Sequence, residues 1–174
     1  KSPLSSSQKA FDAIDQVRSA EREVPRLFHS NLFNIATNDM TLMYGATGAP
    51  HEHWARWRDP WPRAAAEFTD ETEKGLYALL DPARLLDILA HFVVFETREG
   101  RTVKKLCRYQ QFRAVNKMVR RVVEGQQRAG LVWHTQGSGK SLTMVFAALK
   151  LKFHRGVASE RLANPNLLII TDRV

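Results

Sequence analysis

The spacing of apolar residues over the first 46 positions predicts a helix followed by a β-hairpin. Residues 5–8 have the spacing of a capping box, which satisfies backbone groups at a helix start. The apolar residues that follow recur at helical intervals: Phe11, Ile14, Val17 and Val24. Pro25 is expected to end this helix or to restart it as a short second turn, because proline disrupts a helix interior. Residues 32–37 and 40–46 then resemble two strands joined by a tight turn.

Residues 48–62 have no sustained periodicity, and we interpret them as a loop rich in Gly, Pro and His. The segment also holds three tryptophans: Trp54, Trp57 and Trp61. Exposed aromatic rings can stack on nucleic-acid bases, but we expect these rings to anchor the loop to the core. His51 and His53 flank Glu52. Adjacent residues without a further ligand are a weak metal signal, so we expect solvated side chains there.

Two helices are predicted next, at residues 71–80 and 82–95. The second follows an Asp-Pro pair, which suits the cap and the first position of a helix. Another interpretation stays open, in which residues 93–97 and 102–106 form a second hairpin. That hairpin would shorten the second helix.

The pattern at residues 111–127 predicts an amphipathic helix with a basic side. The apolar side carries Phe112, Val115, Met118, Val119, Val122 and Val123. The opposite side carries Arg113, Lys117, Arg120 and Arg121. The plainer interpretation of the basic side is a solvated outer surface.

A Gly-rich turn between apolar segments predicts part of a parallel sheet. Residues 130–134 resemble a short buried strand, residues 140–153 a helix, and residues 166–171 another buried strand. The order strand, loop, helix, strand is that of a parallel α/β unit. We therefore expect an α/β fold for this part of the chain.

The net charge of +8 is unevenly distributed along the sequence. Residues 1–90 hold 10 Lys and Arg against 13 Asp and Glu, whereas residues 91–174 hold 16 against 5. A basic half favours a polyanionic partner, because Lys and Arg release counterions when they neutralise phosphates. Basic surfaces also increase solubility. The charge alone is therefore compatible with either a nucleic-acid partner or a surface that only keeps the protein in solution.

Composition narrows the class of protein further. An apolar content of 44% supports a packed core, and we find neither a run of roughly 18 apolar residues nor a secretion signal. We therefore expect an intracellular, cytoplasmic protein without a membrane span. The single cysteine, Cys107, excludes an internal disulfide and is expected to be a buried small residue. The chain begins without Met and ends at Val174 just after an apolar run, so we expect a piece of a longer protein.

Residues 134–141, His-Thr-Gln-Gly-Ser-Gly-Lys-Ser, match the phosphate-binding P-loop at every fixed position except the first, where His replaces Gly. Successive backbone N–H groups and the following helix N-terminus form a nest for phosphate oxygens. We expect Lys140, also the candidate catalytic lysine, to reach the β and γ phosphates of ATP, and the Ser141 hydroxyl to ligate Mg²⁺. The candidate nucleotide-binding residues of the loop are Thr135, Gln136, Gly137, Ser138, Gly139, Lys140 and Ser141.

A phosphate loop does not reveal what nucleotide hydrolysis drives. An acidic residue at the end of another strand normally holds the magnesium. Asp172, at the end of the apolar run after the loop, is the one such acid in the sequence. It either completes the magnesium site or lies on the next strand of a helicase core, whose magnesium-binding acid would then come after Val174.

Residues 133–144 closely resemble motif I of the motor subunit of type I restriction enzymes, a family of superfamily 2 DNA translocases. Residues 108–115 resemble the family's Q motif, which implies that Gln111, with Gln110 as the alternate, contacts the adenine of ATP. Residues 167–173 resemble the motif Ia strand. This resemblance favours the second interpretation of Asp172 and implies that Asp172 and Arg173 lie near the DNA, with Arg173 as a DNA-binding candidate.

The N-terminus resembles the end of the family's PD-(D/E)xK nuclease domain. On this resemblance Lys1 is the motif's catalytic lysine, and the two metal-binding acids precede it. The family often has a Gln-x-x-x-Tyr element in the next helix, but Gln16 is followed four residues later by Ala20. A DNA contact by Gln16 is therefore not expected.

The resemblance implies an α/β chain with the tail of a nuclease domain and the start of a RecA-like P-loop domain with a parallel sheet. We predict the nuclease part at residues 1–62, a helical connector at residues 63–90 and the motor part at residues 91–174. The family uses ATP and Mg²⁺ to translocate duplex DNA and cleaves unmodified DNA away from the recognition site. Its partners are double-stranded DNA and the specificity and methyltransferase subunits, in a bacterial or archaeal cytoplasm.

Two rival functions remain at this stage. One is a P-loop ATPase or nucleotide switch that acts on protein partners, with Asp172 in its magnesium site. The other is an interaction domain with a vestigial loop. On the first and preferred hypothesis, these 174 residues by themselves are expected neither to cut nor to translocate DNA.

Overall fold

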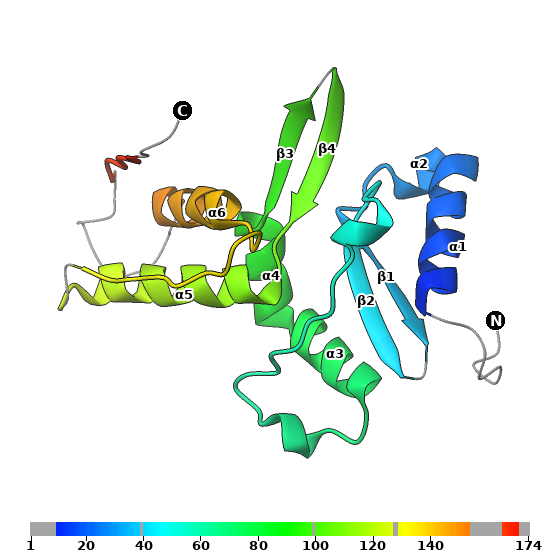
Figure 1. The fold of residues 1–174 in the computed structure, drawn as a ribbon, viewed down its shortest axis with the longest axis horizontal. Coiled ribbons are helices and arrows are strands. Elements are labelled where there is room, and N and C mark those ends of the chain that lie inside the picture. Colours follow the sequence, from blue (N-terminus) through cyan, green and yellow to red (C-terminus); the bar gives the residue numbers. More distant parts are fainter. Residues whose placement is uncertain (1–9, 39, 99, 127–128, 154–164, 171–174) are drawn as a thin grey trace. The chain divides into compact units, whose positions relative to one another are not determined.

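The computed structural model describes residues 10–38, 40–98, 100–126, 129–153 and 165–170. The chain contains both helices and strands (Figure 1) and divides into two compact units, Lys1–Tyr109 and Gln110–Val174. We call these the first unit and the second unit and describe each by itself. The domain boundaries predicted at residues 62 and 90 stay predictions.

The first unit opens with the predicted helix and hairpin. Helix α1 (Ala10–Glu23) is followed directly by the short helix α2 (Pro25–Phe28), in which proline occupies the first position. Strands β1 (Phe33–Asn38) and β2 (Thr41–Ala46) pair antiparallel, with Asn38 opposite Thr41. The hairpin is therefore confirmed, while the expected capping box lies outside the described residues.

Two capped helices and a second hairpin complete the first unit. Helix α3 (Glu71–Leu80) begins after Asp70, and helix α4 (Pro82–His91) begins after Asp81. Each of these aspartates accepts a hydrogen bond from a backbone N–H of its helix. Strands β3 (Val93–Arg98) and β4 (Arg101–Leu106) pair antiparallel. The helix predicted to reach residue 95 therefore ends earlier, as the hairpin interpretation required.

The loop after β2 is anchored by tryptophan, as predicted for two of its three rings. Trp54 is 5% exposed and Trp57 is 4% exposed, whereas Trp61 is 61% exposed. The short 3-10 helix η1 (His51–His53) precedes Trp54, whose indole N–H donates to the Ala49 carbonyl. A second 3-10 helix, η2 (Ala65–Glu67), follows further along. The buried core cluster of this region comprises Ile14, Ala36, Ala46, Ala49 and Trp54.

Tyr44 joins the β1–β2 hairpin to the end of β4. Its side chain is 2% exposed, and its hydroxyl donates to the backbone carbonyl of Cys107 at 3.0 Å. Burial raises the pKa of the Tyr44 hydroxyl well above its ordinary value, because the ionised form would lose its hydration. Cys107 is buried, as predicted. A buried hydrogen bond of this kind contributes about 1 kcal/mol to stability.

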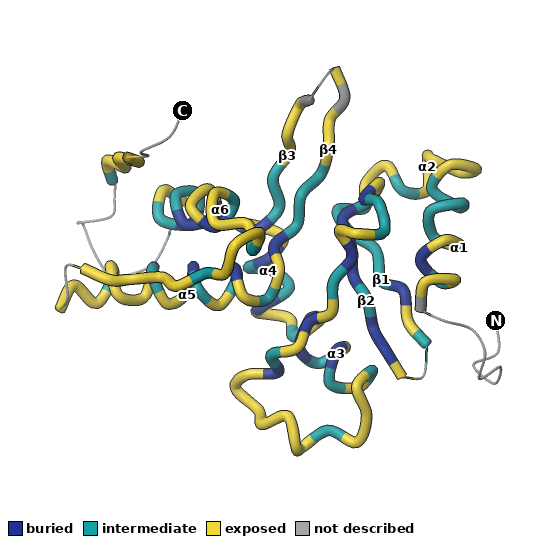
Figure 2. The backbone as a smooth tube through the Cα atoms, in the orientation of Figure 1, coloured by how far each residue is buried: buried dark blue, intermediate teal, exposed yellow. Residues whose placement is uncertain are grey.

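Two helices dominate the described part of the second unit. Helix α5 (Tyr109–Glu124) is amphipathic as predicted and begins at the last residue of the first unit. Figure 2 shows its alternation of buried and exposed positions. Helix α6 (Lys140–Lys152) follows the P-loop. The largely buried Lys150 of α6 donates to the Asn116 side-chain oxygen of α5 at 2.6 Å, so a polar contact joins the two helices.

The two strands predicted beside the P-loop are not formed. Residues 129–135 and 165–170 have no regular secondary structure, so the strand predictions at 130–134 and 166–171 are wrong for the residues that are described. Leu131, Trp133 and Leu168 are each at least 85% exposed. A strand is stabilised by hydrogen bonds to a neighbouring strand, and the described residues pair only within the two hairpins. A parallel sheet is therefore absent from the described part of the chain.

Candidate nucleotide-binding site

The P-loop bends through two glycines that precede α6. Gly137 has a φ of 74° and Gly139 has a φ of 81°, both in the left-handed region that favours glycine. Gly139 is the N-cap of α6, so the helix begins with Lys140. The first amides of a helix lack partners within the helix and carry its positive dipole end. The loop therefore leads into a helix terminus that suits an anion.

The side chains of the loop gather at the carbonyl of Thr135. The Lys140 ammonium group donates to this oxygen at 3.0 Å, and the Ser138 hydroxyl donates to it at 2.6 Å. The Ser138 oxygen also lies 3.2 Å from the His134 ring nitrogen Nδ1. Lys140 and Ser141 are exposed. The donor set fits a nucleotide with its metal, because it offers an exposed ammonium group for phosphate and an exposed hydroxyl for Mg²⁺.

The remaining loop candidates lie together in the same turn. Thr135, Gln136, Gly137 and Gly139 are exposed, and Ser138 is half-buried. A side chain built on Gly137 would have no atom within 4 Å of its Cβ. Open space therefore lies above the backbone at this position, as the approach of a phosphate group requires.

Gln111 connects helix α5 to the loop. Its side chain is 2% exposed, and its amide nitrogen donates to the Gly139 carbonyl at 3.0 Å. Gln110 is exposed. A Cβ on Gly139 would lie 2.5 Å from the same amide nitrogen. The geometry thus favours Gln111 over Gln110 as the residue associated with the nucleotide loop.

Sequence reasoning did not identify two polar side chains that support the loop. The Thr143 hydroxyl, 3% exposed, donates to the Gly139 carbonyl at 3.1 Å. His134, which the sequence gives as the irregular first position of the loop and as part of the family resemblance, contacts Ser138. The sequence does contain a signal for each contact. For the first it is a threonine one turn into a largely apolar helix, and for the second it is a His-Ser pair four residues apart.

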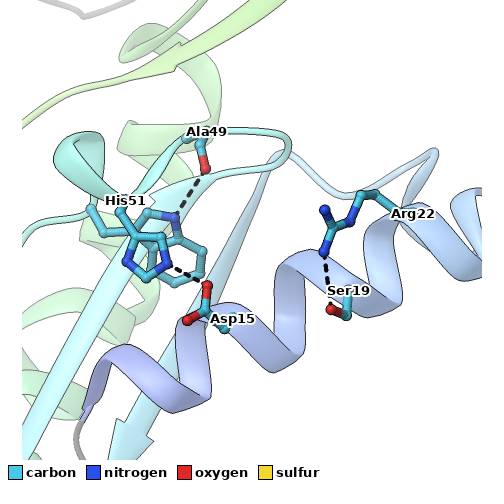
Figure 3. Close-up of polar contacts among 6 residues, drawn as sticks. Asp15, Ser19, Arg22, Ala49 and His51 are labelled. Atoms are coloured by element: carbon cyan, nitrogen blue, oxygen red, sulfur yellow. Dashed lines mark hydrogen bonds and ion pairs between the residues drawn. The ribbon is translucent and has the colours of Figure 1, made fainter.

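Three other site candidates are not placed by the structure. Lys1, Asp172 and Arg173 lie outside the described residues. His51, expected to be solvated, is instead half-buried: its ring nitrogen lies 2.5 Å from an Asp15 carboxylate oxygen (Figure 3) and its ring stacks on Phe11. Over the described ranges, three or more His, Cys, Asp or Glu side chains do not gather in a way that would hold a metal ion.

Comparison with known proteins identifies relatives of this chain. Residues 110–174 match the SWI2/SNF2 ATPase family, and this match begins where the second unit begins. The whole chain is 34% identical, over 99% of its length, to the type I restriction enzyme HindI endonuclease subunit of Haemophilus influenzae. The chain is homologous to type I restriction enzyme endonuclease subunits. The resemblance noted in the sequence is therefore confirmed.

A second relative of this chain is an archaeal protein. A protein of Methanocaldococcus jannaschii, assigned as the MjaVIIIP endonuclease subunit of a type I restriction enzyme, is 34% identical over 79% of the chain. The chain spans 17% of the Haemophilus protein and 14% of the Methanocaldococcus protein. No solved structure matches the chain. Within the described residues, none of the helices has the length and apolar character needed to cross a membrane.

Proposed function

We propose that this chain is part of an ATP-dependent type I restriction endonuclease subunit, which translocates duplex DNA and cleaves unmodified DNA away from its recognition site. The observation that carries this proposal is the loop of residues 134–141, with its two left-handed glycines and exposed Lys140 at the start of α6. The SWI2/SNF2 ATPase match over Gln110–Val174 supports an energy-coupled role for this loop. The specificity and methyltransferase subunits are the proposed partners, in the cytoplasm of a bacterium or archaeon.

Different residues of the loop bind different parts of ATP and its Mg²⁺. Lys140 neutralises charge on the β and γ phosphates, and the backbone amides of residues 136–141 bind phosphate oxygens. The Ser141 hydroxyl is one ligand of Mg²⁺, which supplies charge stabilisation for phosphoryl transfer when bound. Gln111 contacts the adenine, and its bond to the Gly139 carbonyl fixes its position beside the loop.

The other proposed roles rest on family resemblance alone. Lys1 is the proposed catalytic lysine of the nuclease part, at residues 1–62. Arg173 is a proposed DNA contact of the motor part, at residues 91–174, with Asp172 beside it. The helical connector is proposed at residues 63–90.

Replacing the loop lysine tests the proposal. In the full-length protein, assembled with its specificity and methylation subunits, Lys140→Ala should lower DNA-stimulated ATP hydrolysis by at least about 100-fold, since phosphate charge stabilisation is lost. Lys152→Ala is the matched control, because Lys152 is an exposed lysine on the same helix. It should leave hydrolysis and cleavage unchanged.

Two outcomes of this experiment contradict the proposal. Unchanged ATP hydrolysis and cleavage in Lys140→Ala would remove the role of the loop. ATP hydrolysis that depends on Lys140 but that responds to a protein partner and not to DNA would support a nucleotide switch in place of a DNA motor.

A further inference from the structure

The net positive charge of this chain comes entirely from the second unit. Residues 1–109 hold 15 Lys and Arg and 15 Asp and Glu, so their formal charges cancel. Residues 110–174 hold 11 Lys and Arg against 3 Asp and Glu, which gives the whole net charge of +8. A surface adapted only for solubility would mix both signs. The separation of charge points to a polyanion that contacts the second unit.

Helix α5 concentrates part of this charge on one side. Because successive residues of an α-helix are turned by roughly 100°, its four basic residues fall within an arc of about 100° and along about 12 Å of helix. All four are exposed: Arg113, Lys117, Arg120 and Arg121. We call this set the α5 basic face. The sequence of α5 contains a single carboxylate, Glu124, at its last position.

Buried residues on the opposite side of α5 keep the basic face exposed. Val115 is fully buried and Val119 is 4% exposed, and both lie on the side away from the basic residues. On that same side Gln111 is bonded to the Gly139 carbonyl of the phosphate loop. Rotating the helix to hide its cations would expose these buried groups, which would cost several kcal/mol of apolar burial. The basic face is therefore a fixed surface.

We propose that the α5 basic face binds the phosphate backbone of duplex DNA. This inference rests on the proposed function and assigns a DNA-contacting surface to it. Three of the four cations are arginines, whose planar guanidinium groups bind phosphate through two parallel hydrogen bonds. Duplex DNA presents one negative charge per roughly 1.7 Å of its axis, so a 12 Å row of cations meets several phosphates. Contacts of this kind bind DNA without regard to its sequence.

Helix α5 would then touch both ligands of the motor. Its basic face contacts DNA, and Gln111 on its buried side contacts the loop that holds ATP. A rigid helix between the two sites is a physical connection through which DNA binding can affect the nucleotide loop.

The salt dependence of DNA binding tests the assignment. The double variant Lys117→Gln/Arg120→Gln is compared with Arg56→Gln/Arg58→Gln, which removes two exposed cations from the first unit. Binding of a labelled duplex without a recognition sequence is measured with the full-length protein over about 50 to 200 mM salt. Unchanged thermal unfolding and ATP binding establish that each variant is folded.

The expected result is a specific loss in the α5 variant. Its slope of log K against log salt should become less steep by about 2, and its DNA affinity should fall roughly tenfold or more near 0.1 M salt, since two phosphate contacts are lost. The Arg56/Arg58 variant should match the unaltered protein.

Two results would overturn the inference. One is an equal slope and affinity in the α5 variant and the unaltered protein. The other is unchanged DNA binding together with weaker assembly with the partner subunits, which would make the face a protein interface. In either case DNA-stimulated ATP hydrolysis that still requires Lys140 would leave the proposed function standing, whereas its absence in the unaltered protein would remove the proposed function itself.

Discussion

Glycine is required for different reasons at one position in each of the two units. In the first unit, Gly45 of β2 is required by its surroundings, because a Cβ there would lie 2.6 Å from the ring of the buried Trp54. In the second unit, Gly137 is required by its own backbone, since its φ is 74° while nothing lies within 4 Å of a Cβ. Neighbours therefore determine the residue in the packed unit, and backbone shape determines it in the open loop. An open, backbone-defined loop suits a ligand, and a filled core does not.

The first prediction concerns Gly45 and has the larger expected effect. Gly45→Ala should lower the free energy of unfolding by about 1–3 kcal/mol, because the added methyl group overpacks a core that holds the Trp54 ring in place. Urea denaturation of the protein measures this change.

A double-mutant cycle isolates the cause of that loss. In the background of Trp54→Phe, whose ring is smaller, the cost of Gly45→Ala should be reduced. Equal costs in the two backgrounds would show that Trp54 does not impose the glycine, and the contrast between the units would be lost.

The second prediction concerns Gly137 and has a smaller effect. Gly137→Ala should lower the free energy of unfolding by about 1–2 kcal/mol, because a side chain strains the left-handed backbone. Gly137→Asn should cost less than Gly137→Ala, since asparagine adopts this region more readily. The same denaturation measurement compares the two variants, and a larger cost for the bulkier asparagine would mean that space, and not φ, restricts the position.

Local sequence signals predicted most of the elements that form. The β1–β2 hairpin, the aspartate-capped helix α4 and the amphipathic α5 follow from short-range patterns. The proline-started α2 and the β3–β4 hairpin are each one of two interpretations that those patterns leave open. These elements satisfy their hydrogen bonds within a few residues of sequence, so their causes are local.

Long-range requirements explain the failures. The apolar runs around Leu131 and Leu168 have the pattern of buried strands, but a parallel strand needs neighbours from distant sequence. The described residues contain no such neighbours for them. Trp61 resembles the buried Trp54 and Trp57 in sequence, yet it is exposed. Burial depends on which surfaces meet, and residue type alone does not specify that.

The candidate nucleotide loop could be predicted from sequence, but the hydrogen bonds that hold it could not. The order Gly-Ser-Gly-Lys-Ser is enough to predict a phosphate-binding loop, because consecutive residues bind the phosphate in loops of this kind. The bond from Gln111 to Gly139 spans 28 positions. Only the family resemblance singled out Gln111 ahead of Gln110, and the structure adds that Gln111 is the one bonded to the loop.

The nucleotide requirement of DNA cleavage tests the central claim most directly. The full-length protein, assembled with its specificity and methylation subunits, is given unmethylated DNA with ATP, with a non-hydrolysable ATP analogue, or with no nucleotide. Cleavage away from the recognition site is expected only with hydrolysable ATP. Cleavage without nucleotide, or equal cleavage with the analogue, would contradict the central claim.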